Sequence, residues 1–422
     1  MDILIKNIHL INPEQNLDTV TDLLIENGVI KKIGEIEKTK NVETLEFQNA
    51  YCAPGFFDMH VHFREPGYEQ AETLLTGANS AAEGGFTGVA VMPNTSPAID
   101  NGDLVNSVLA KTKSHLVDVL PIGAVTVGRK GEQLAPMAEM AEEGAVAFSD
   151  DGTAVKTAKI LRYALEYSGM LNKVIIEHCE DESLAGGAMN EGKISTELGL
   201  PPVPAIAEEL TVARDIIVAE YTDSPIHIAH ISTKKSVELV QRAKEKGVRI
   251  TAEATPHHFT LTENSLKSYD TNFKMNPPLR TETDKRAIIE GLKNGTIDVI
   301  ASDHAPHAVE DKEVEFTFAP NGIIGLETEL GLTLTELYHK KVLTLKEIIY
   351  KFSINPRKIL GLPLPMIEIG AKANLTIFDA DKPWTVDKNK FKSKSRNTPF
   401  DKKLLTGKAL AVINNNQLHL ID

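Results

Sequence analysis

Residues 55–63 read Gly-Phe-Phe-Asp-Met-His-Val-His-Phe, an apolar run that carries a His-x-His pair and is followed by Arg64. In a strand, residues i and i+2 point to the same side, so His60 and His62 can face one metal ion together. A single histidine at a strand end is more often a hydrogen-bonded core residue than a ligand. The pair, preceded by Asp58 and followed by Arg64, favours a metal site.

Seven more short apolar runs follow, and longer helical patterns separate them. Strands that alternate with helices imply parallel βα units, and eight units predict a closed (β/α)8 TIM-type barrel rather than an open sheet. The eight predicted strands are residues 55–63, 87–94, 118–126, 145–152, 173–180, 225–232, 249–257 and 298–304. The helical patterns include residues 109–116, 158–169, 206–220, 234–247 and 284–295.

Each of these runs begins apolar and ends in a polar or ionisable residue. The C-terminal ends of barrel strands converge on one face, where residues far apart in the sequence can share a site. The sequence therefore predicts one active site built from the strand ends. Its candidates are His60, His62, Asn94, Thr126, Asp151, His178, His230, His257 and Asp303.

The two ends of the chain differ from the middle and resemble each other. Apolar and polar residues alternate around Asn27-Gly28, a strong hairpin signal, and again around the asparagines at 414–416. We predict a small β-sandwich domain built from both termini, residues 1–52 plus 365–422. The barrel would then occupy residues 53–364.

Composition excludes several classes of partner. Lys and Arg number 45 against 59 Asp and Glu, so the formal net charge is −14. This argues against nucleic acid or an anionic membrane, although one local Arg can still bind a small anionic substrate. Two cysteines are too few for a disulfide framework, and no signal-peptide pattern or apolar run of about 20 residues occurs. We expect a cytoplasmic protein.

His178 and His230 each close an apolar strand run. With His60 and His62 they supply four neutral nitrogen donors, which suit Zn²⁺. Asp303, after the eighth run, can ligate the metal and take a proton from a metal-bound water. The alternative for Asp303 is a cap on the following helix, which would leave the histidines unexplained.

The fourth run ends in Asp150 and Asp151, and strand alternation sends only one of them inward. Spacing alone leaves open which one. The inward carboxylate could bridge two ions about 3.5–4 Å apart. The alternative is an Asp-Asp-Gly turn with no role in metal binding.

Eight motifs together resemble the long-chain (type I) dihydroorotases of the amidohydrolase superfamily, over nearly the whole chain. His-x-His alone marks only the superfamily, whereas the full set is much more specific. The motifs are His-x-His-x-Arg at 60–64, Met-Pro-Asn-Thr at 92–95, Ser-Asp-Asp-Gly at 149–152, Glu-His-Cys-Glu-Asp at 177–181, His-Ile-Ser at 230–232, Thr-Pro-His-His at 255–258, Met-Asn-Pro-Pro-Leu-Arg at 275–280 and Ser-Asp-His-Ala-Pro-His at 302–307.

The resemblance implies a metal site and a reaction. It selects Asp151 over Asp150 as the carboxylate that bridges the metal ions. It implies one or two zinc ions per chain, and we expect two. A metal-bound hydroxide would attack the ring amide of dihydroorotate to give N-carbamoyl-aspartate, a step of pyrimidine biosynthesis, with Asp303 as the catalytic proton acceptor. The implied ligands are His60, His62, Asp151, His178, His230 and Asp303.

The resemblance also implies the substrate contacts. Arg64, Asn94 and His307 would hold the substrate carboxylate, and Asn276 would meet the ring. The family usually has an aromatic residue where this chain has Asn321, so contacts from Asn321 and Gly322 would come from the backbone. Taken alone, Arg64 could equally form a structural ion pair, and Asn276 in Met-Asn-Pro-Pro would be a turn former.

Two alternative functions are weighed against this one. Hydantoinases, dihydropyrimidinases and allantoinases use a carboxylated lysine as the bridge, and the nearest lysines here, Lys156 and Lys159, lie in the next predicted helix. A non-catalytic partner of aspartate transcarbamoylase would have lost metal ligands, which this chain keeps. For assembly we expect a homodimer, with association with aspartate transcarbamoylase as a second option.

The remaining candidates are interpreted as structural. Cys179 would point away from the site and Cys52 would lie in the core, so neither is a nucleophile. His257, His258 and His304 are expected to hydrogen-bond around the site rather than ligate. The histidines at 9, 115, 227, 339 and 419 fall outside the pattern. Residues 308–324 are predicted to form a long polar loop.

Overall fold

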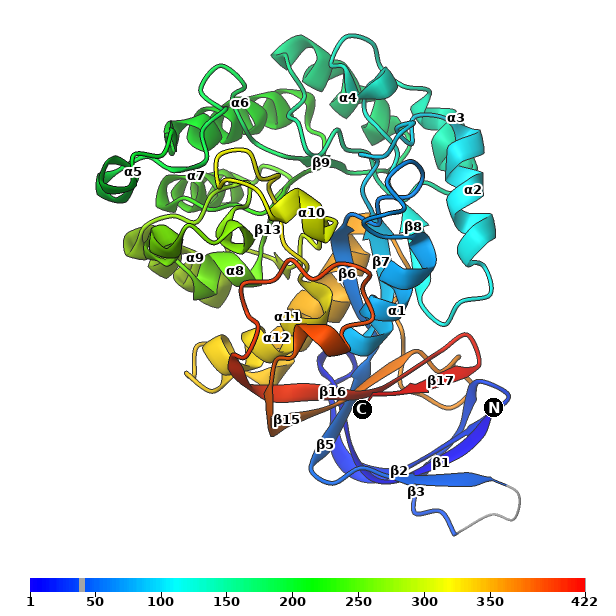
Figure 1. The fold of residues 1–422 in the computed structure, drawn as a ribbon. Coiled ribbons are helices and arrows are strands. Elements are labelled where there is room, and N and C mark those ends of the chain that lie inside the picture. Colours follow the sequence, from blue (N-terminus) through cyan, green and yellow to red (C-terminus); the bar gives the residue numbers. More distant parts are fainter. Residues whose placement is uncertain (38–41, 422) are drawn as a thin grey trace.

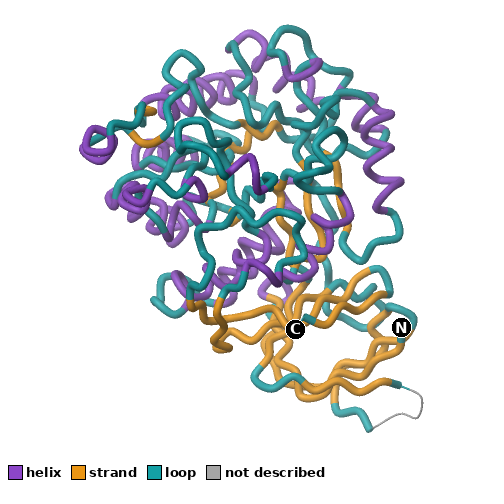
Figure 2. The backbone as a smooth tube through the Cα atoms, viewed as in Figure 1, coloured by secondary structure: helices purple, strands orange, loops and turns teal. Residues whose placement is uncertain are grey.

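The chain folds into a barrel with a sheet at one end (Figure 1). The structure is a computed structural model, and it describes residues 1–37 and 42–421. Helices ring the barrel strands, and the long terminal strands gather at one end of the molecule (Figure 2). Within the described ranges, no helix has both the length and the apolar composition needed to cross a membrane.

The predicted barrel is confirmed, as two parallel sheets joined by single bridges. Phe148 bridges Gly123 on one side and Ile175 on the other, and Val61 bridges His304, which closes the ring. One sheet has the order β6 (Phe56–Val61), β7 (Phe86–Val91), β8 (Asp118–Pro121); the other has the order β14 (Val299–Ile300), β13 (Ile250–Ala254), β12 (Ile226–Ile228), β9 (Ile175–Glu177).

The fourth strand predicted over 145–152 is present but shorter than predicted. Only Phe148 makes ladder bridges there, although the segment occupies the fourth strand's position between β8 and β9. The polar residues that follow redirect the chain: Ser149 donates its hydroxyl to Ile176 O, and the Asp150 carboxylate accepts from Thr126. Before this point the backbone still pairs with both neighbours: Val146 N donates to Pro121 O at 3.0 Å, and Phe148 N donates to Val174 O at 3.1 Å.

Threonine and asparagine caps start the principal barrel helices. These are α1 (Leu74–Gly84), α2 (Gly102–Thr112), α4 (Ala158–Met170), α6 (Ile206–Thr222), α7 (Lys234–Glu245), α9 (Glu282–Asn294) and α11 (Leu326–Thr333), all but α6 and α11 with a side-chain cap. Shorter helices are α3 (Met137–Glu142), α5 (Lys193–Leu198), α8 (Pro256–Thr260), α10 (Val309–Lys312), α12 (Leu345–Ile349) and α13 (Asn355–Leu360).

Two of the helix and loop predictions need correction. The helix predicted over 109–116 begins earlier, at Gly102, because the Asn101 side chain accepts from Leu104 N and caps it there. It ends at Thr112, and residues 113–116 turn instead. The predicted loop 308–324 contains the short helix α10.

Both termini build one sheet, as predicted, through the antiparallel pairing of β5 with β15. The eight strands form a single hydrogen-bonded sheet that folds over on itself, so that its N-terminal and C-terminal strands enclose one apolar core. The strands are β1 (Asp2–Asn12), β2 (Leu17–Glu26), β3 (Val29–Gly34), β4 (Glu43–Glu46), β5 (Ala50–Pro54), β15 (Leu375–Thr385), β16 (Leu404–Asn414) and β17 (Gln417–Leu420). A two-strand pair, β10 (Met189–Asn190) and β11 (Pro202–Val203), lies between β9 and α6.

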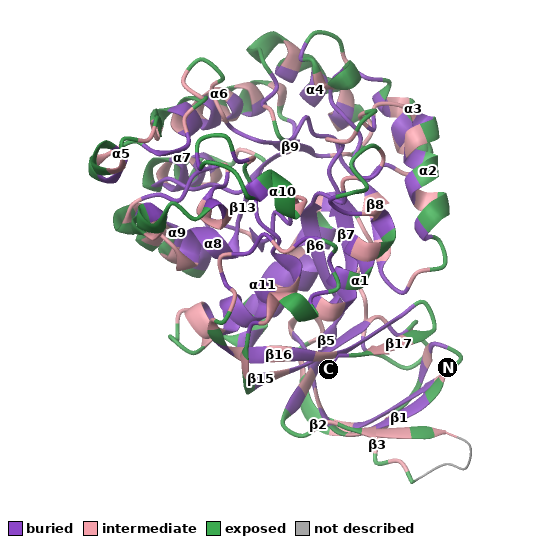
Figure 3. Cartoon of the chain, viewed as in Figure 1, coloured by how far each residue is buried: buried purple, intermediate pink, exposed green. Residues whose placement is uncertain are grey.

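An aromatic cluster joins the barrel to this sheet. The Phe56 ring lies 5.4 Å from that of Phe352, 5.7 Å from Phe378 on β15 and 6.3 Å from Phe86. Burial is concentrated on the barrel strands and on the inner faces of the helices (Figure 3). The cluster therefore couples the stability of the two parts.

Replacing Phe56 with alanine should lower the free energy of unfolding by about 3–5 kcal/mol, because the cavity left at this junction cannot be filled by its packed neighbours. Urea denaturation followed by circular dichroism measures the loss. Phe318→Ala is the matched control, since that side chain is 76% exposed and should change stability by less than about 0.5 kcal/mol. Equal losses in the two variants would contradict the role given to the cluster.

Candidate active site

Six of the predicted site residues converge at the C-terminal ends of the barrel strands. His60 lies near the end of strand β6 and His62 just after it. Asp151 follows Phe148, His178 follows β9, His230 follows β12 and Asp303 follows β14. All six side chains are buried. The set is His60, His62, Asp151, His178, His230 and Asp303.

Asp151 lies at the centre of this group. Its Oδ1 is 3.5 Å from His60 Nε2, 3.5 Å from His230 Nε2 and 3.7 Å from His178 Nδ1, and its Oδ2 is 3.4 Å from His62 Nε2. One carboxylate therefore faces a nitrogen of all four histidines. This is the position that a carboxylate shared between two ions would need.

Asp150 points the other way. Its carboxylate accepts from the backbone N–H of Thr126 at 3.0 Å and from the Thr126 hydroxyl at 2.5 Å. Neither Lys156 nor Lys159 lines the cavity beside Asp151. The two alternatives for a bridge at this strand end, the neighbouring aspartate and a lysine, thus lie outside the site.

His60 is oriented by a buried residue that the sequence analysis missed. His60 Nδ1 lies 2.5 Å from Glu253 Oε1, and the other carboxylate oxygen of Glu253 lies 3.1 Å from His227 Nε2. A carboxylate on Nδ1 fixes the ring and makes Nε2 a better ligand. The sequence holds one signal for this role: Glu253 is a charged residue inside the apolar strand pattern at 249–257. A charged side chain that is buried needs a partner, so Glu253 could have been expected to bind another site residue.

His62 bonds to both Asn94 and Asp303. Its Nδ1 bonds to Asn94 Oδ1 at 2.8 Å, and its Nε2 lies 2.9 Å from Asp303 Oδ1. Since the Asn94 oxygen is used by His62, its amide nitrogen is the group left to donate to a ligand.

His178 and His230 form the other side of the centre. His178 Nδ1 and His230 Nε2 are 3.0 Å apart. Asn276 Nδ2 lies 3.3 Å from His178 Nε2 and donates to Glu180 Oε2 at 3.1 Å. Asn276 therefore borders His178 and lines the cavity next to it.

Two buried groups of side chains could each hold a metal ion. One is His60, Asp151 and His230, and the other is His60, His62 and Asp303, with the ligand atoms of each group within 4.8 Å of one another. His60 Nε2 and Asp151 Oδ1 are buried and have no hydrogen-bond partner among the described residues. Buried polar atoms rarely stay unpaired, so these orphaned atoms fit a bound cation.

Electrostatics keep both central carboxyl groups ionised. Burial alone would raise the pKa of Asp151, but the positive charge of the adjacent histidines, His60 foremost, holds it well below its usual range. Burial likewise opposes ionisation of Asp303, yet the hydrogen bond with His62 and the charge of His60 lower its pKa to about 2. Both groups are therefore available as anionic ligands and proton acceptors near neutral pH.

Three site residues adopt left-handed backbone conformations that non-glycine residues rarely adopt. Their φ angles are +61° at Arg64, +28° at His230 and +48° at Asp303. Such conformations cost about 1–3 kcal/mol each and persist where the surrounding structure enforces them. The local strain turns these three side chains toward the centre.

A cavity of about 220 Å³ opens beside the centre and is lined by every predicted substrate residue. This volume suits a compact single-ring molecule better than the larger ligands of most pockets. The residues in question are Arg64, Asn94, Asn276, His307, Asn321 and Gly322.

Arg64 supplies a positive charge to this cavity, and His307 lies in the same lining. Arg64 Nε donates to Pro306 O at 3.1 Å, which fixes the guanidinium plane, and burial lowers the pKa of Arg64 to about 10. His307 Nε2 donates to Asn321 O at 2.7 Å, and burial followed by the Arg64 charge lowers the pKa of His307 to about 3. An incoming carboxylate would offset that repulsion and favour the imidazolium, whose Nδ1–H could then donate.

The residues interpreted as structural are placed as follows. Cys52 and Cys179 are both buried free thiols, and Cys179 contacts Asp215 rather than the cavity. His258 bonds to Thr255 and to Pro277 O, beside Asn276. His227, expected outside the pattern, is the exception because it bonds to Glu253 within the site.

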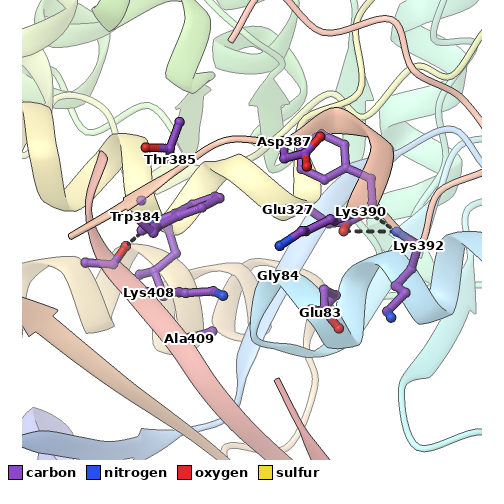
Figure 4. Close-up of a pocket in the computed structure, with 14 residues that line it drawn as sticks. Glu83, Gly84, Glu327, Trp384, Thr385, Asp387, Lys390, Lys392, Lys408 and Ala409 are labelled. Atoms are coloured by element: carbon purple, nitrogen blue, oxygen red, sulfur yellow. Dashed lines mark hydrogen bonds between the residues drawn. The ribbon is translucent and has the colours of Figure 1, made fainter. Parts of the chain in front are cut away.

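A larger cavity of about 630 Å³ lies elsewhere, between α1, α11 and the strands β15 and β16 (Figure 4). None of the described histidines lines it. The larger cavity is therefore not the one on which the ionisable groups converge; those groups line the smaller cavity.

The chain is similar in sequence to proteins named dihydroorotase. A family model described as Dihydro-orotase-like matches residues 51–236. A dihydroorotase from Pelotomaculum thermopropionicum is 51% identical over 414 residues, which cover 98% of this chain and 97% of that protein. A dihydroorotase from Geobacter metallireducens is 48% identical over 403 residues, which cover 95% of each chain.

Solved structures share the fold over the whole chain. An L-hydantoinase (dihydropyrimidinase) from Arthrobacter aurescens matches with a TM-score of 0.88 and 25% identity, covering 100% of this chain and 96% of that one. A dihydropyrimidinase from Brevibacillus agri NCHU1002 matches with a TM-score of 0.83 and 21% identity, covering 100% and 95%. The barrel and the terminal sheet thus occur together in these proteins.

Proposed function

The chain belongs to the dihydroorotase family, and we propose that two zinc ions at its buried centre serve the reaction of that family. The chain is a cyclic amide hydrolase that interconverts dihydroorotate and N-carbamoyl-aspartate in pyrimidine biosynthesis. The observation that carries the proposal of two ions is the placement of Asp151, whose carboxylate faces nitrogens of all four histidines.

Six side chains of the chain would bind the two ions. His60, His62 and Asp303 would hold one ion, His178 and His230 the other, and Asp151 would bridge them. Zinc, when bound, lowers the pKa of a coordinated water toward 7 and polarises a substrate carbonyl. Glu253 holds His60 in the orientation that presents Nε2 to the centre.

Asp303 is the proposed proton carrier. Its low pKa leaves it as a carboxylate, so it can accept the proton of the attacking water. It then returns that proton to the ring nitrogen as the amide bond breaks. The backbone strain at Asp303 and its contact with His62 keep the carboxylate at one place through both transfers.

The substrate carboxylate has a matching site on one side of the cavity. Arg64 offers a planar guanidinium fixed at its Nε, and Asn94 and His307 flank it. Asn276 would meet the ring, and the backbone of Asn321 and Gly322 would close its far side. A ring without a carboxylate would leave the Arg64 charge buried and unmatched.

The deciding experiment compares ring opening of dihydroorotate, hydantoin, dihydrouracil and allantoin by the zinc-loaded protein. We expect turnover of dihydroorotate to exceed that of the other three by at least about 100-fold, since they lack the carboxylate that Arg64 requires. Preference for hydantoin or dihydrouracil would favour the hydantoinase-type alternative. A metal-free chain that still binds aspartate transcarbamoylase would favour the non-catalytic one.

Replacing Arg64 with methionine should lower kcat/KM for dihydroorotate by about 10- to 100-fold, because a charge-assisted hydrogen bond worth about 1.5–3 kcal/mol is lost. Steady-state kinetics measure the change. Arg242→Met, at an exposed position of α7, is the control and should leave kcat/KM unchanged. A wild-type KM in Arg64→Met would mean that the carboxylate is held elsewhere.

Assembly is a separate part of the proposal. We propose a homodimer, which size-exclusion chromatography with light scattering would test. Adding aspartate transcarbamoylase to the same measurement tests the second expected form of association.

A further inference from the structure

A segment of the C-terminal region leaves the terminal sheet and crosses to the barrel. We refer to residues 386–400, between β15 and β16, as the strap. In Figure 1 the orange-red chain between these two strands rises from the sheet to the loops beneath α10. The strap thus brings residues from outside the barrel to the face that holds the metal centre.

Two carboxylates, the half-buried Glu327 and the buried Glu72, anchor the strap. Glu327 of α11 accepts hydrogen bonds from the backbone N–H of Lys392 (Figure 4) and from that of Ser393. Glu72 accepts from the Ser393 hydroxyl and from the N–H of Lys394 at 3.2 Å. Several donors are therefore fixed within three residues, which sets the path of the chain just before Asn397.

Asn397, 4% exposed, uses all of its side-chain hydrogen-bonding groups on the substrate loops. Its Nδ2 donates to Ala305 O at 3.0 Å and to Gly322 O at 3.1 Å, and its Oδ1 accepts from His307 N at 3.2 Å. Its backbone carbonyl also accepts from Ile324 N at 3.0 Å. One side chain therefore ties the segment after β14 to the segment around residue 322.

We propose that Asn397 is a positioning residue that sets the spacing between His307 and Gly322, on the two walls of the substrate cavity. The inference rests on the proposed function, since it assigns a role toward the same substrate. A primary amide is the side chain that fits, because the site needs two donated hydrogens and one acceptor in one plane. Aspartate keeps the acceptor for His307 N but faces two carbonyl oxygens without a hydrogen to donate.

Loss of the Asn397 side chain should affect substrate binding and not the chemical step. Among the described residues, the side chain of Asn397 bonds to Ala305, Gly322 and His307 and to none of the proposed metal ligands, so its loss should leave the reacting groups in place. It holds the groups assigned to the substrate carboxylate and ring, so its loss should weaken binding. A residue that served only to stabilise the fold would reduce the amount of folded protein and leave the KM of that protein unchanged.

The test measures kcat, KM, zinc content and unfolding midpoint for Asn397→Ala and for the isosteric Asn397→Asp, both loaded with zinc. We expect KM for dihydroorotate to rise by about 10- to 100-fold in both variants, with kcat per zinc-loaded chain within about threefold of wild type. Asn389→Ala is the control, because Asn389 is an exposed asparagine of the same strap and should leave KM unchanged.

A wild-type KM in either folded variant would overturn the role given to Asn397, and so would a fall in kcat with KM unchanged. If Asn397→Ala yields no folded protein, Asn397→Asp decides by itself, because it preserves the volume of the side chain. Turnover of dihydroorotate by the wild-type chain tests the proposed function alone. The ratio of variant KM to wild-type KM tests the inference.

Discussion

Asp303→Ala is expected to lower kcat for dihydroorotate by at least about 10³-fold while the protein remains folded. A positioned proton acceptor contributes about 10²–10⁴-fold, and the same substitution removes a proposed metal ligand. The Asp303 carboxylate is 7% exposed and lies 2.9 Å from His62 Nε2, so water cannot readily take its place. Steady-state kinetics with measured zinc content separate the loss of the acceptor from the loss of metal.

Asp298→Ala controls for general damage to the same strand. Asp298 precedes β14 at its opposite end and accepts hydrogen bonds from Lys244, far from the reacting groups. Its loss should lower stability and leave kcat per folded chain close to wild type. A wild-type rate in Asp303→Ala would remove Asp303 from the mechanism.

Asp151→Ala is expected to show the second large effect, this time on the metal. Wild-type protein should contain two zinc ions per chain by elemental analysis, and the variant should lose at least one together with nearly all activity. The reason is geometric: the Asp151 carboxylate faces all four histidines, so without it their nitrogens have no shared anion.

The neighbouring residue supplies a close control for this variant. Asp150→Ala removes a carboxylate one position away that bonds to Thr126 rather than to the histidines. Zinc content should stay at two per chain in that variant. One zinc ion per chain in the wild-type protein would mean that Asp151 lies beside a single ion and bridges nothing.

The barrel and the strand-end residues could be predicted because their signals are local. Alternating strands and helices require a parallel sheet, and parallel strands place their C-terminal residues on one face. The fourth strand was predicted too long because side-chain bonds of Ser149 and Asp150 follow its short paired segment. An apolar pattern predicts that a segment is buried. It does not predict which hydrogen bonds the backbone of that segment makes.

The residues that were missed act over long distances in the sequence. Glu253 orients His60 from 193 positions away, and Asn397 holds His307 from 90 positions away. A buried carboxylate inside an apolar strand could have singled out Glu253. Asn397 has no such signal, because it lies in an irregular segment whose path depends on Glu327 and Glu72.

The terminal sheet has a consequence for how the protein is made. Strand β5 ends at Pro54, and its partner β15 begins at Leu375, roughly 320 residues later. At about 5–20 residues per second, the ribosome takes roughly 15–60 s to supply that partner. Through this interval the apolar faces of β1 and β2 and the open edge of β5 remain exposed, which is the condition that invites aggregation. The nascent chain is therefore expected to depend on chaperones until β15, β16 and the strap have emerged.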